Sequence, residues 1–156
     1  PVYIRLGRLA VEAVHDAETF KFELGKGVQI KEGNDLTIVA TGLMVAEAIE
    51  AADKLASEGI DARVINIHTI KPIDKDILIK AAKETGAIVT AEEHSVIGGL
   101  GGAVCEAICE EYPVPVIRLG VNDTFGKSGP AVELLHIFGL DAENIVKKAK
   151  LAISKK

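Results

Sequence analysis

The sequence predicts an α/β fold, a three-layer α/β/α sandwich in which helices cover both faces of a mostly parallel sheet. From Leu36 onward, short apolar runs rich in β-branched residues alternate with longer segments of helical spacing. Strands that alternate with helices form right-handed βαβ units. Glycines follow several of the helical segments, where a left-handed residue commonly ends a helix. We therefore expect one domain, residues 36–156, around a parallel sheet.

The residues before this domain have a weaker pattern. The first residues are strand-like and begin abruptly at Pro1, without a starting methionine. We therefore expect residues 1–8 to be the last strand of a preceding domain. Residues 9–35 are expected to form a linker with short strands. Glycines and a Gly-Asn-Asp cluster supply turns there, so that the stretch Val28–Asp35 would close a small hairpin with Thr19–Glu23.

Three strands are predicted in the first part of the regular region. They are near-continuous apolar runs, as in strands buried on both faces of a sheet. They span Leu36–Thr41, Ala62–Ile67 and Ala87–Ala91. Two helices separate them, because apolar residues recur at helical spacing from Val45 to a stop at Gly59, and again from the N-cap Asp74 to Gly86.

The third strand leads into an acidic turn with a histidine, Glu92–His94, and then into a glycine-rich loop, Gly98–Gly102. A helix is predicted from Ala103 to Glu111. The remaining elements follow in the order strand, polar loop, short helix and final helix. They are expected at Val116–Gly120, at Val121–Gly129, at Pro130–His136 and from the N-cap Asp141 onward.

Composition excludes several classes of protein. The net charge of −5, with scattered Lys and Arg, argues against a nucleic-acid surface, which needs a clustered basic patch. No apolar run approaches the roughly 18 residues of a membrane span. Without a signal peptide we expect a soluble, cytoplasmic protein. Cys105 and Cys109 lie four apart on a predicted helix and are expected to be small buried hydrophobes in a reducing compartment.

The glycine-rich loop fits no nucleotide-binding motif. Gly99 and Gly101 begin a dinucleotide fingerprint, but Val104 stands where the third small residue belongs. The N–H groups at a helix start can still hold an anion, and the nearest anions are the protein's own Glu92 and Glu93 or a partner's carboxylate. Close packing of helix on sheet, or of subunit on subunit, is the favoured interpretation.

A second partial match to a nucleotide-binding motif follows the fourth predicted strand. Gly126-Lys127-Ser128 resembles the end of a phosphate-binding P-loop, but Val121 occupies the position of the required first glycine. A genuine P-loop is therefore not expected.

The histidines do not form a convincing reactive site. His94 is a candidate general base, because its pKa lies near neutrality and carboxylates adjoin it, but no nucleophile pattern accompanies it. A loop or interface role is favoured. His15, His68 and His136 are isolated, and with the cysteines they give no metal-ligand spacing, so no metal site is expected.

Two arginines come near strand ends. The planar fork of an arginine can clamp a phosphate, which makes Arg8 and Arg118 candidates for an anion contact. On residue type alone, a surface salt bridge is the favoured role for each.

Six short motifs occur in register along essentially the whole chain. They are Ile4–Arg8, Thr37–Gly42, Arg63–Asn66, Thr69–Asp74, Glu92–His94 with Gly98–Gly101, and Phe125–Gly129. Together they resemble the C-terminal domain of the transketolase family with its preceding strand attached, a section that forms part of a separate chain in a split transketolase. The resemblance implies a five-stranded mixed sheet with Val28–Ile30 or Leu36–Thr41 at an edge.

The resemblance also implies a function. Transketolases use thiamine diphosphate and Mg²⁺ to move a two-carbon ketol unit between sugar phosphates. In that family the cofactor lies between the two preceding domains, across a dimer interface. We therefore expect this chain to hold no cofactor, no metal and no catalytic residue. Its partners would be the upstream domains or subunit and a second copy.

Site residues carry over from the family one by one. Arg8 matches the arginine that ends the family's pyrimidine-binding domain and contacts the substrate phosphate. His94 matches a histidine found in part of the family. Glu93, His94, Gly99 and Gly101 are expected to be loop or interface residues.

Several alternatives remain from the sequence alone. Deoxyxylulose-phosphate synthase has a similar acidic turn and glycine loop, but the Leu6-Gly7-Arg8 context and Phe125–Gly129 favour transketolase. The β subunits of 2-oxo-acid dehydrogenases are a further match. From other classes, the chain would be a regulatory module that senses an anion or nucleotide at the glycine loop, or a stand-alone hydrolase that uses His94.

Overall fold

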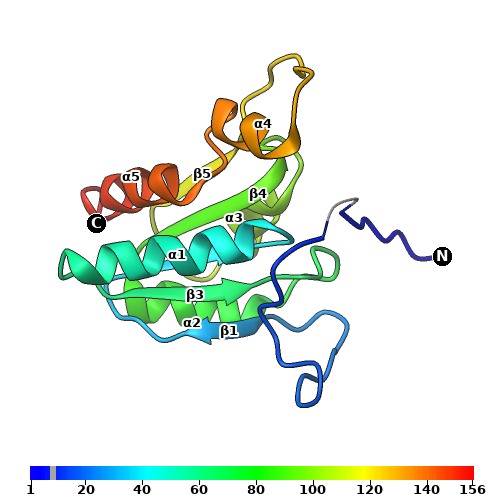
Figure 1. The fold of residues 1–156 in the computed structure, drawn as a ribbon. Helices are drawn as coiled ribbons and strands as arrows, with labels where there is room; N and C mark the ends of the chain where they lie inside the picture. Colours follow the sequence, from blue (N-terminus) through cyan, green and yellow to red (C-terminus); the bar gives the residue numbers. More distant parts are fainter. Residues whose placement is uncertain (8–9) are drawn as a thin grey trace.

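A five-stranded sheet between two layers of helices forms the core of the computed structural model, which describes residues 1–7 and 10–156 (Figure 1). The strands are β1 (Val28–Lys31), β2 (Leu36–Ala40), β3 (Ala62–Asn66), β4 (Ile88–Ser95) and β5 (Val116–Val121). Their order in the sheet is β1-β3-β2-β4-β5. The pairs β2–β3, β2–β4 and β4–β5 are parallel, and only β1 is antiparallel, to β3. The predicted five-stranded, mostly parallel α/β sheet is confirmed.

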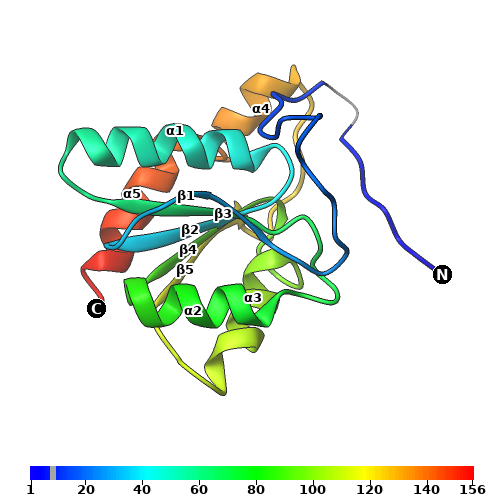
Figure 2. The ribbon, with the colours of Figure 1, turned by 90° about the horizontal axis from the view of Figure 1, so that it is seen from below.

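Helices cover both faces of the sheet. They are α1 (Met44–Ser57), α2 (Lys75–Thr85), α3 (Leu100–Cys109), α4 (Ala131–Ile137) and α5 (Ala142–Ile153). Figure 2 shows α1 and α5 on one side of the sheet and α2 and α3 on the other. Successive side chains of β2 point to opposite faces of the sheet. Ile38 packs in the hydrophobic cluster under α1 and α5, and Val39 packs in the cluster under α2 and α3.

Local sequence signals set several helix boundaries. Asp74 caps α2, because its Oδ1 accepts the Ile77 N–H at 3.3 Å, and Gly86 ends that helix at a φ of +68°. Asp141 caps α5, accepting the Asn144 N–H at 2.9 Å. The predicted caps of both helices are confirmed.

The predicted hairpin is wrong. Residues Thr19–Glu23 form no strand, and β1 pairs with β3 instead. The alternative that Leu36–Thr41 lies at an edge is also wrong, because β2 is the central strand and is buried along its whole length. The turn between β1 and β2 passes so close to β3 that a Cβ on Gly33 would lie 2.2 Å from the Arg63 nitrogen. This close approach allows β1 to reach the edge next to β3.

The predicted acidic turn is also wrong. Residues Glu92–His94 are part of β4, which runs to Ser95, and α3 begins at Leu100 instead of Ala103. The glycine-rich segment is therefore a short connection followed by the first turn of the helix.

The first residues are expected to be the last strand of a preceding domain. Residues 1–7 are exposed and form no strand; their assignment to a preceding domain stays a prediction, since a strand needs neighbours with which to pair.

Both cysteines are free, but Cys105 is only half-buried and Cys109 is exposed, so the expectation of burial is wrong. Within the described residues, no helix has both the length and the apolar character needed to cross a bilayer.

Candidate functional site

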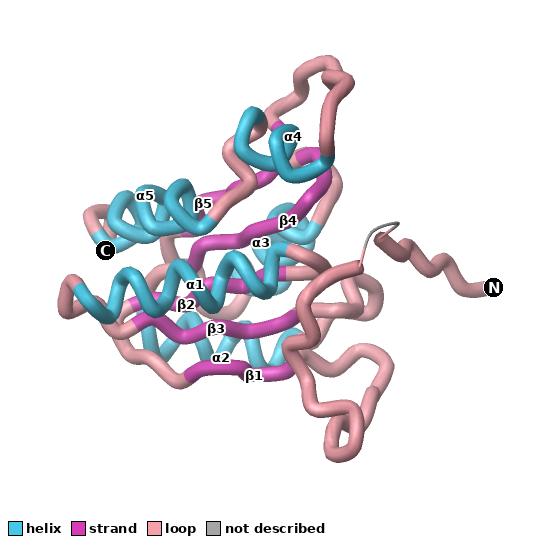
Figure 3. Tube along the Cα trace, in the orientation of Figure 1, coloured by secondary structure: helices cyan, strands magenta, loops and turns pink. Residues whose placement is uncertain are grey.

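The carboxyl ends of the four parallel strands meet at one edge of the sheet. The chain leaves the central strand β2 for β3 on one side and returns to β4 on the other, so the strand order reverses beside β2. Ligands of open α/β sheets commonly bind at such a reversal. Figure 3 shows that loops gather at this end of the molecule, among them the segment that precedes β1. This carboxyl edge is the candidate site.

A buried carboxylate already occupies the helix start at this edge. The Glu92 side chain is 1% exposed; its Oε2 accepts the Leu100 N–H at 2.7 Å and its Oε1 the Gly101 N–H at 2.9 Å. The positive end of the helix dipole stabilises this negative charge. The prediction that an acid of the protein itself meets the helix start is confirmed for Glu92. The arrangement opposes an anion or nucleotide sensor, because the two N–H groups that would bind a phosphate are taken.

The glycines of the loop make room for this carboxylate and for the sheet. A Cβ on Gly99 would lie 2.0 Å from Glu92 Oε2, and a Cβ on Gly101 would lie 2.8 Å from Thr90 Oγ1 and 2.7 Å from Arg118 Cδ. Both positions therefore exclude any larger side chain. Close packing explains Gly99 and Gly101 better than a ligand does.

Glu93 and His94 lie at the end of β4, where Glu93 is partly exposed and His94 is exposed. Arg5 Nη1 donates to the Glu93 carbonyl oxygen at 3.0 Å, and its Nη2 lies 3.8 Å from Glu93 Oε2. Arg5 thus contacts the end of β4, whereas its neighbours Ile4 and Leu6 are exposed. His94 Nδ1 lies 3.0 Å from the Ser95 carbonyl oxygen and 3.9 Å from Glu92 Oε2. No hydroxyl or thiol that the structure describes is hydrogen-bonded to His94, so the arrangement offers no activated nucleophile.

The structure shows the contacts of only one of the two candidate arginines, Arg118. Arg118 forms no surface salt bridge in the described structure; its Nη1 donates to the Val96 carbonyl oxygen at 2.8 Å, and its stem packs beside Gly101. It thus fixes the chain after β4. Arg8 lies outside the described residues, so its assignment to the substrate phosphate stays a prediction.

A histidine cluster lies at the carboxyl end of β3, and sequence reasoning missed it by treating His15 and His68 as isolated. The Asn66 Nδ2 lies 2.9 Å from His15 Nε2, although the two residues are 51 positions apart. His68 Nδ1 lies 2.8 Å from Thr69 Oγ1. Burial lowers the pKa of His68, and the charge of His15 lowers it further. No sequence signal joins His15 to β3, because the contact arises only when the chain folds back over the sheet.

The described residues do not fit a transketolase cofactor. No three or more His, Cys, Asp or Glu residues within 1–7 and 10–156 are placed to hold a metal ion. Mg²⁺ in such enzymes needs several oxygen ligands, and a diphosphate needs free N–H groups or cations. The helix start that would offer N–H groups carries Glu92 instead.

Exposed apolar side chains are concentrated near the carboxyl edge. They come from the segment before β1, from the loops after β3, β4 and β5, and from α4: Val11, Phe22, Leu24, Ile70, Ile97, Phe125, Val132 and Ile137. Phe125 is 98% exposed, and α4 has no buried residue. Apolar side chains that gather into a contiguous patch commonly mark an interface, which makes this edge a candidate contact surface.

Comparison with known proteins gives consistent matches. The model of the family described as transketolase, C-terminal domain, matches residues 25–145. The 6-deoxy-6-sulfo-D-fructose transketolase subunit SqwH of Clostridium sp. (strain MSTE9) is 51% identical over 149 residues, which are 96% of this chain and 46% of that protein. The 1-deoxy-D-xylulose-5-phosphate synthase of Heliobacterium modesticaldum is 41% identical over 96% of this chain and 24% of its own length.

A solved structure agrees with the fold throughout. The protein described as a split gene transketolase, inactive beta4 tetramer, has a TM-score of 0.96 and 53% identity, and the match covers 100% of this chain and 51% of that one. This chain spans about half the length of that structure and of the transketolase subunit.

Proposed function

This chain belongs to the transketolase C-terminal domain family, and we propose that it is the terminal domain of a thiamine-diphosphate-dependent transketolase, without catalysis of its own. The observation that carries the proposal is the match of the entire chain to half of a split transketolase chain at 53% identity. The family model, which matches residues 25–145, supports the same assignment. The reacting groups would then lie on the preceding domains or subunit.

The carboxyl edge is the proposed docking surface for those preceding domains. Residues 1–8 would be the last strand of a pyrimidine-binding domain, and the described part of this segment approaches the edge through the Arg5–Glu93 contact. The exposed apolar residues of this edge, Phe125 among them, would be covered there. Each Å² of apolar surface buried there would stabilise the joined domains by about 25 cal/mol.

Substrate and cofactor would bind only in the assembled enzyme. Thiamine diphosphate and Mg²⁺ would be held by the preceding domains, and Arg8 would bind the phosphate of a sugar-phosphate substrate through its bidentate fork. A homodimer in the cytoplasm is the proposed working form. Glu93 and His94 would face the interface, whereas Gly99 and Gly101 would allow the close packing of the loop and the start of α3 beneath it.

A ligand-stabilisation experiment tests the division of labour. The chain is heated with and without thiamine diphosphate and Mg²⁺, and its midpoint of unfolding is compared. No shift is expected, because a ligand raises the midpoint only when it binds the native state. A shift of several degrees would refute the assignment of the cofactor to the preceding domains.

Identity to deoxyxylulose-phosphate synthase supports a second candidate, the terminal domain of that enzyme, although at 41% against 51% for the transketolase subunit. The chain is assembled with its natural upstream polypeptide and assayed for both reactions. Ketol transfer between sugar phosphates would support transketolase. Condensation of pyruvate with glyceraldehyde phosphate would support the synthase.

A further inference from the structure

We propose that a groove between the loop after β3 and helix α3 is the surface on which a second copy of this chain docks, with the basic wall of each copy over the acidic wall of the other. The groove is lined by residues from two segments, 70–75 and 98–110. It lies on the face of the sheet that α2 and α3 cover together (Figure 2). The inference rests on the proposed homodimer and adds the face through which it forms.

The apolar lining of the groove is partly small and partly exposed. Gly102, Ala103 and Ala107 line its α3 side, and a Cβ on Gly102 would meet no atom within 4 Å. Ile70 and Ile73 line the opposite side, and Ile70 is 39% exposed. Another chain can therefore approach α3 closely, and burial of the isoleucines would favour its association.

Charged side chains of opposite sign line the two sides of the groove. Lys71 and Lys75 come from the loop after β3 and the start of α2, whereas Glu106 lies on α3 and Glu110 at its C-terminal end. All four residues are exposed, and none is ion-paired with any other residue that the structure describes. The carboxylate of Asp74, which lies between the two lysines in sequence, instead accepts two backbone N–H groups. The groove thus has one basic wall and one acidic wall.

A groove with two such walls is complementary to itself. In an isologous contact both copies use the same patch, and the two-fold axis lies in the plane between them. When that axis runs along the groove, the rotation places the basic wall of each copy over the acidic wall of the other. A patch of a single sign would instead repel its own copy. The two walls therefore favour a second copy of this chain over a partner in which one charge dominates.

The preceding domain is proposed to dock elsewhere. Its contact is the carboxyl edge, where Arg5 reaches the end of β4. The groove continues along α3 to Cys109 and Glu110, at the opposite end of that helix. The two surfaces overlap only near Ile70 and the start of α3, so each has residues that can be changed separately.

Charge reversal with complementation tests the surface, and sedimentation equilibrium of the whole chain measures its dimer dissociation constant. Lys71→Glu with Lys75→Glu makes both walls acidic, and Glu106→Lys with Glu110→Lys makes both walls basic. Each double variant should weaken self-association at least about tenfold, because like charges then face each other. An equal mixture of the two variants should form a mixed dimer about as tightly as the unmodified chain, since opposite charges meet again on both walls.

The matched control is Lys80→Glu with Lys83→Glu. It makes the same change in net charge at exposed residues of α2 that do not line the groove, and it should leave self-association unchanged. The groove substitutions suit the fold, because an acid at the start of α2 and bases toward the end of α3 interact favourably with the helix dipoles.

Two results would overturn the inference in different ways. If the chain dimerises but the groove variants associate like the control, or their mixture does not pair, the docking face is wrong and the proposed homodimer stands. If the unmodified chain stays monomeric at every accessible concentration, this surface does not bind a second copy. The assignment to the end of a transketolase is tested separately, by the thiamine diphosphate experiment.

Cys109 provides a measurement on the unmodified chain. The side chain is exposed and lines the groove. Its alkylation by iodoacetamide, followed at this residue by mass spectrometry, should slow as the chain concentration rises through the dissociation constant, because docking covers the thiol. A constant rate while the chain dimerises would show that the dimer uses another surface.

Discussion

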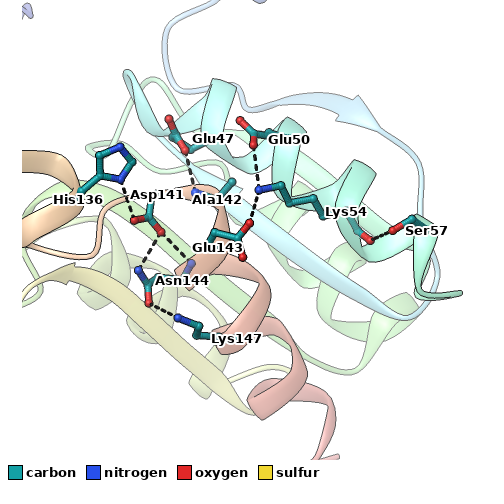
Figure 4. Close-up of polar contacts among 10 residues, drawn as sticks. All are labelled: Glu47, Glu50, Lys54, Ser57, His136, Asp141, Ala142, Glu143, Asn144 and Lys147. Atoms are coloured by element: carbon teal, nitrogen blue, oxygen red, sulfur yellow. Dashed lines mark hydrogen bonds and ion pairs between the residues drawn. The ribbon is translucent and has the colours of Figure 1, made fainter. Parts of the chain in front are cut away.

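The starts of α3 and α5 satisfy the same physical requirement in different ways. Helix α5 begins with Asp141, a cap within its own segment, and Glu47 of α1 adds a second carboxylate that accepts the Ala142 N–H at 2.7 Å (Figure 4). Helix α3 has no side-chain cap at Gly99, and the carboxylate comes from Glu92 in the preceding strand. Unpaired N–H groups at a helix start need acceptors, and either a neighbour in sequence or a neighbour in space can supply them.

The two helix starts differ in how deeply the capping carboxylate is buried and in how much space it leaves for neighbouring side chains. The start of α5 is partly exposed, and Lys54 of α1 bonds Glu143 and Glu50 nearby, the latter at 3.1 Å (Figure 4). The start of α3 is closed, and its carboxylate leaves no space for a Cβ on Gly99. A buried cap should therefore contribute more to stability and tolerate fewer substitutions.

The largest effect is expected for Glu92→Ala. The change leaves the Leu100 and Gly101 N–H groups buried without an acceptor, and it should lower the free energy of unfolding by about 3 kcal/mol. Urea unfolding measures it. Glu93→Ala is the adjacent control and should cost less than about 1 kcal/mol, because its side chain is partly exposed. Equal losses for the two variants would contradict a buried cap.

A pair of glycine substitutions tests the packing around that cap. Gly99→Ala should cost about 2 kcal/mol, since its Cβ would overlap Glu92 Oε2. Gly102→Ala, inside α3 with open space around its Cβ, should raise stability by about 0.5 kcal/mol or more. Thermal unfolding of both variants gives the comparison. A stable Gly99→Ala protein would mean that Glu92 is free to move.

Local caps should contribute less. Asp141→Ala is expected to cost about 1 kcal/mol, whereas Asp74→Ala should cost slightly more, because Asp74 also accepts the Gly27 N–H. The midpoints of urea unfolding rank the two. If Asp141→Ala were as harmful as Glu92→Ala, the contrast between a cap within the helix's own segment and a fully buried cap from a neighbouring strand would fail.

The cap of α5 should also depend on pH. Burial tends to raise the pKa of Asp141, but hydrogen bonds from Asn144 and His136 outweigh it and leave the pKa below its usual value. Its contribution is therefore present above the ordinary pKa of about 4 and is lost as pH falls through the lowered one. Unfolding at pH 7 and pH 3 should show a smaller difference in Asp141→Asn than in the unmodified chain.

The smallest effect is expected for His94→Ala. The ring is exposed, and its closest polar contact is with the neighbouring Ser95 carbonyl oxygen. Stability should change by less than about 0.5 kcal/mol. A loss comparable to that of Asp141→Ala would reveal a role for His94 in holding β4.

Residue patterns predicted the regular elements better than the site. The apolar runs located β2 and β3, and Asp74, Gly86 and Asp141 marked helix ends, because these signals act within one turn or one strand. The extent of β4 was misjudged, because Glu92–His94 look like a polar turn. Their place in a strand depends on α3, whose N–H groups make burial of Glu92 favourable.

The sequence by itself therefore determined the α/β class, the caps that lie within a helix's own segment, and the family to which the chain is similar. Tertiary structure decided which strand lies at the edge, which carboxylate meets α3, and how His15 reaches Asn66. The reason is the range of the interactions. Periodicity and capping depend on residues a few positions apart, whereas the pairing of β1 with β3 and the contact of His15 with Asn66 join segments that meet only after the chain has folded.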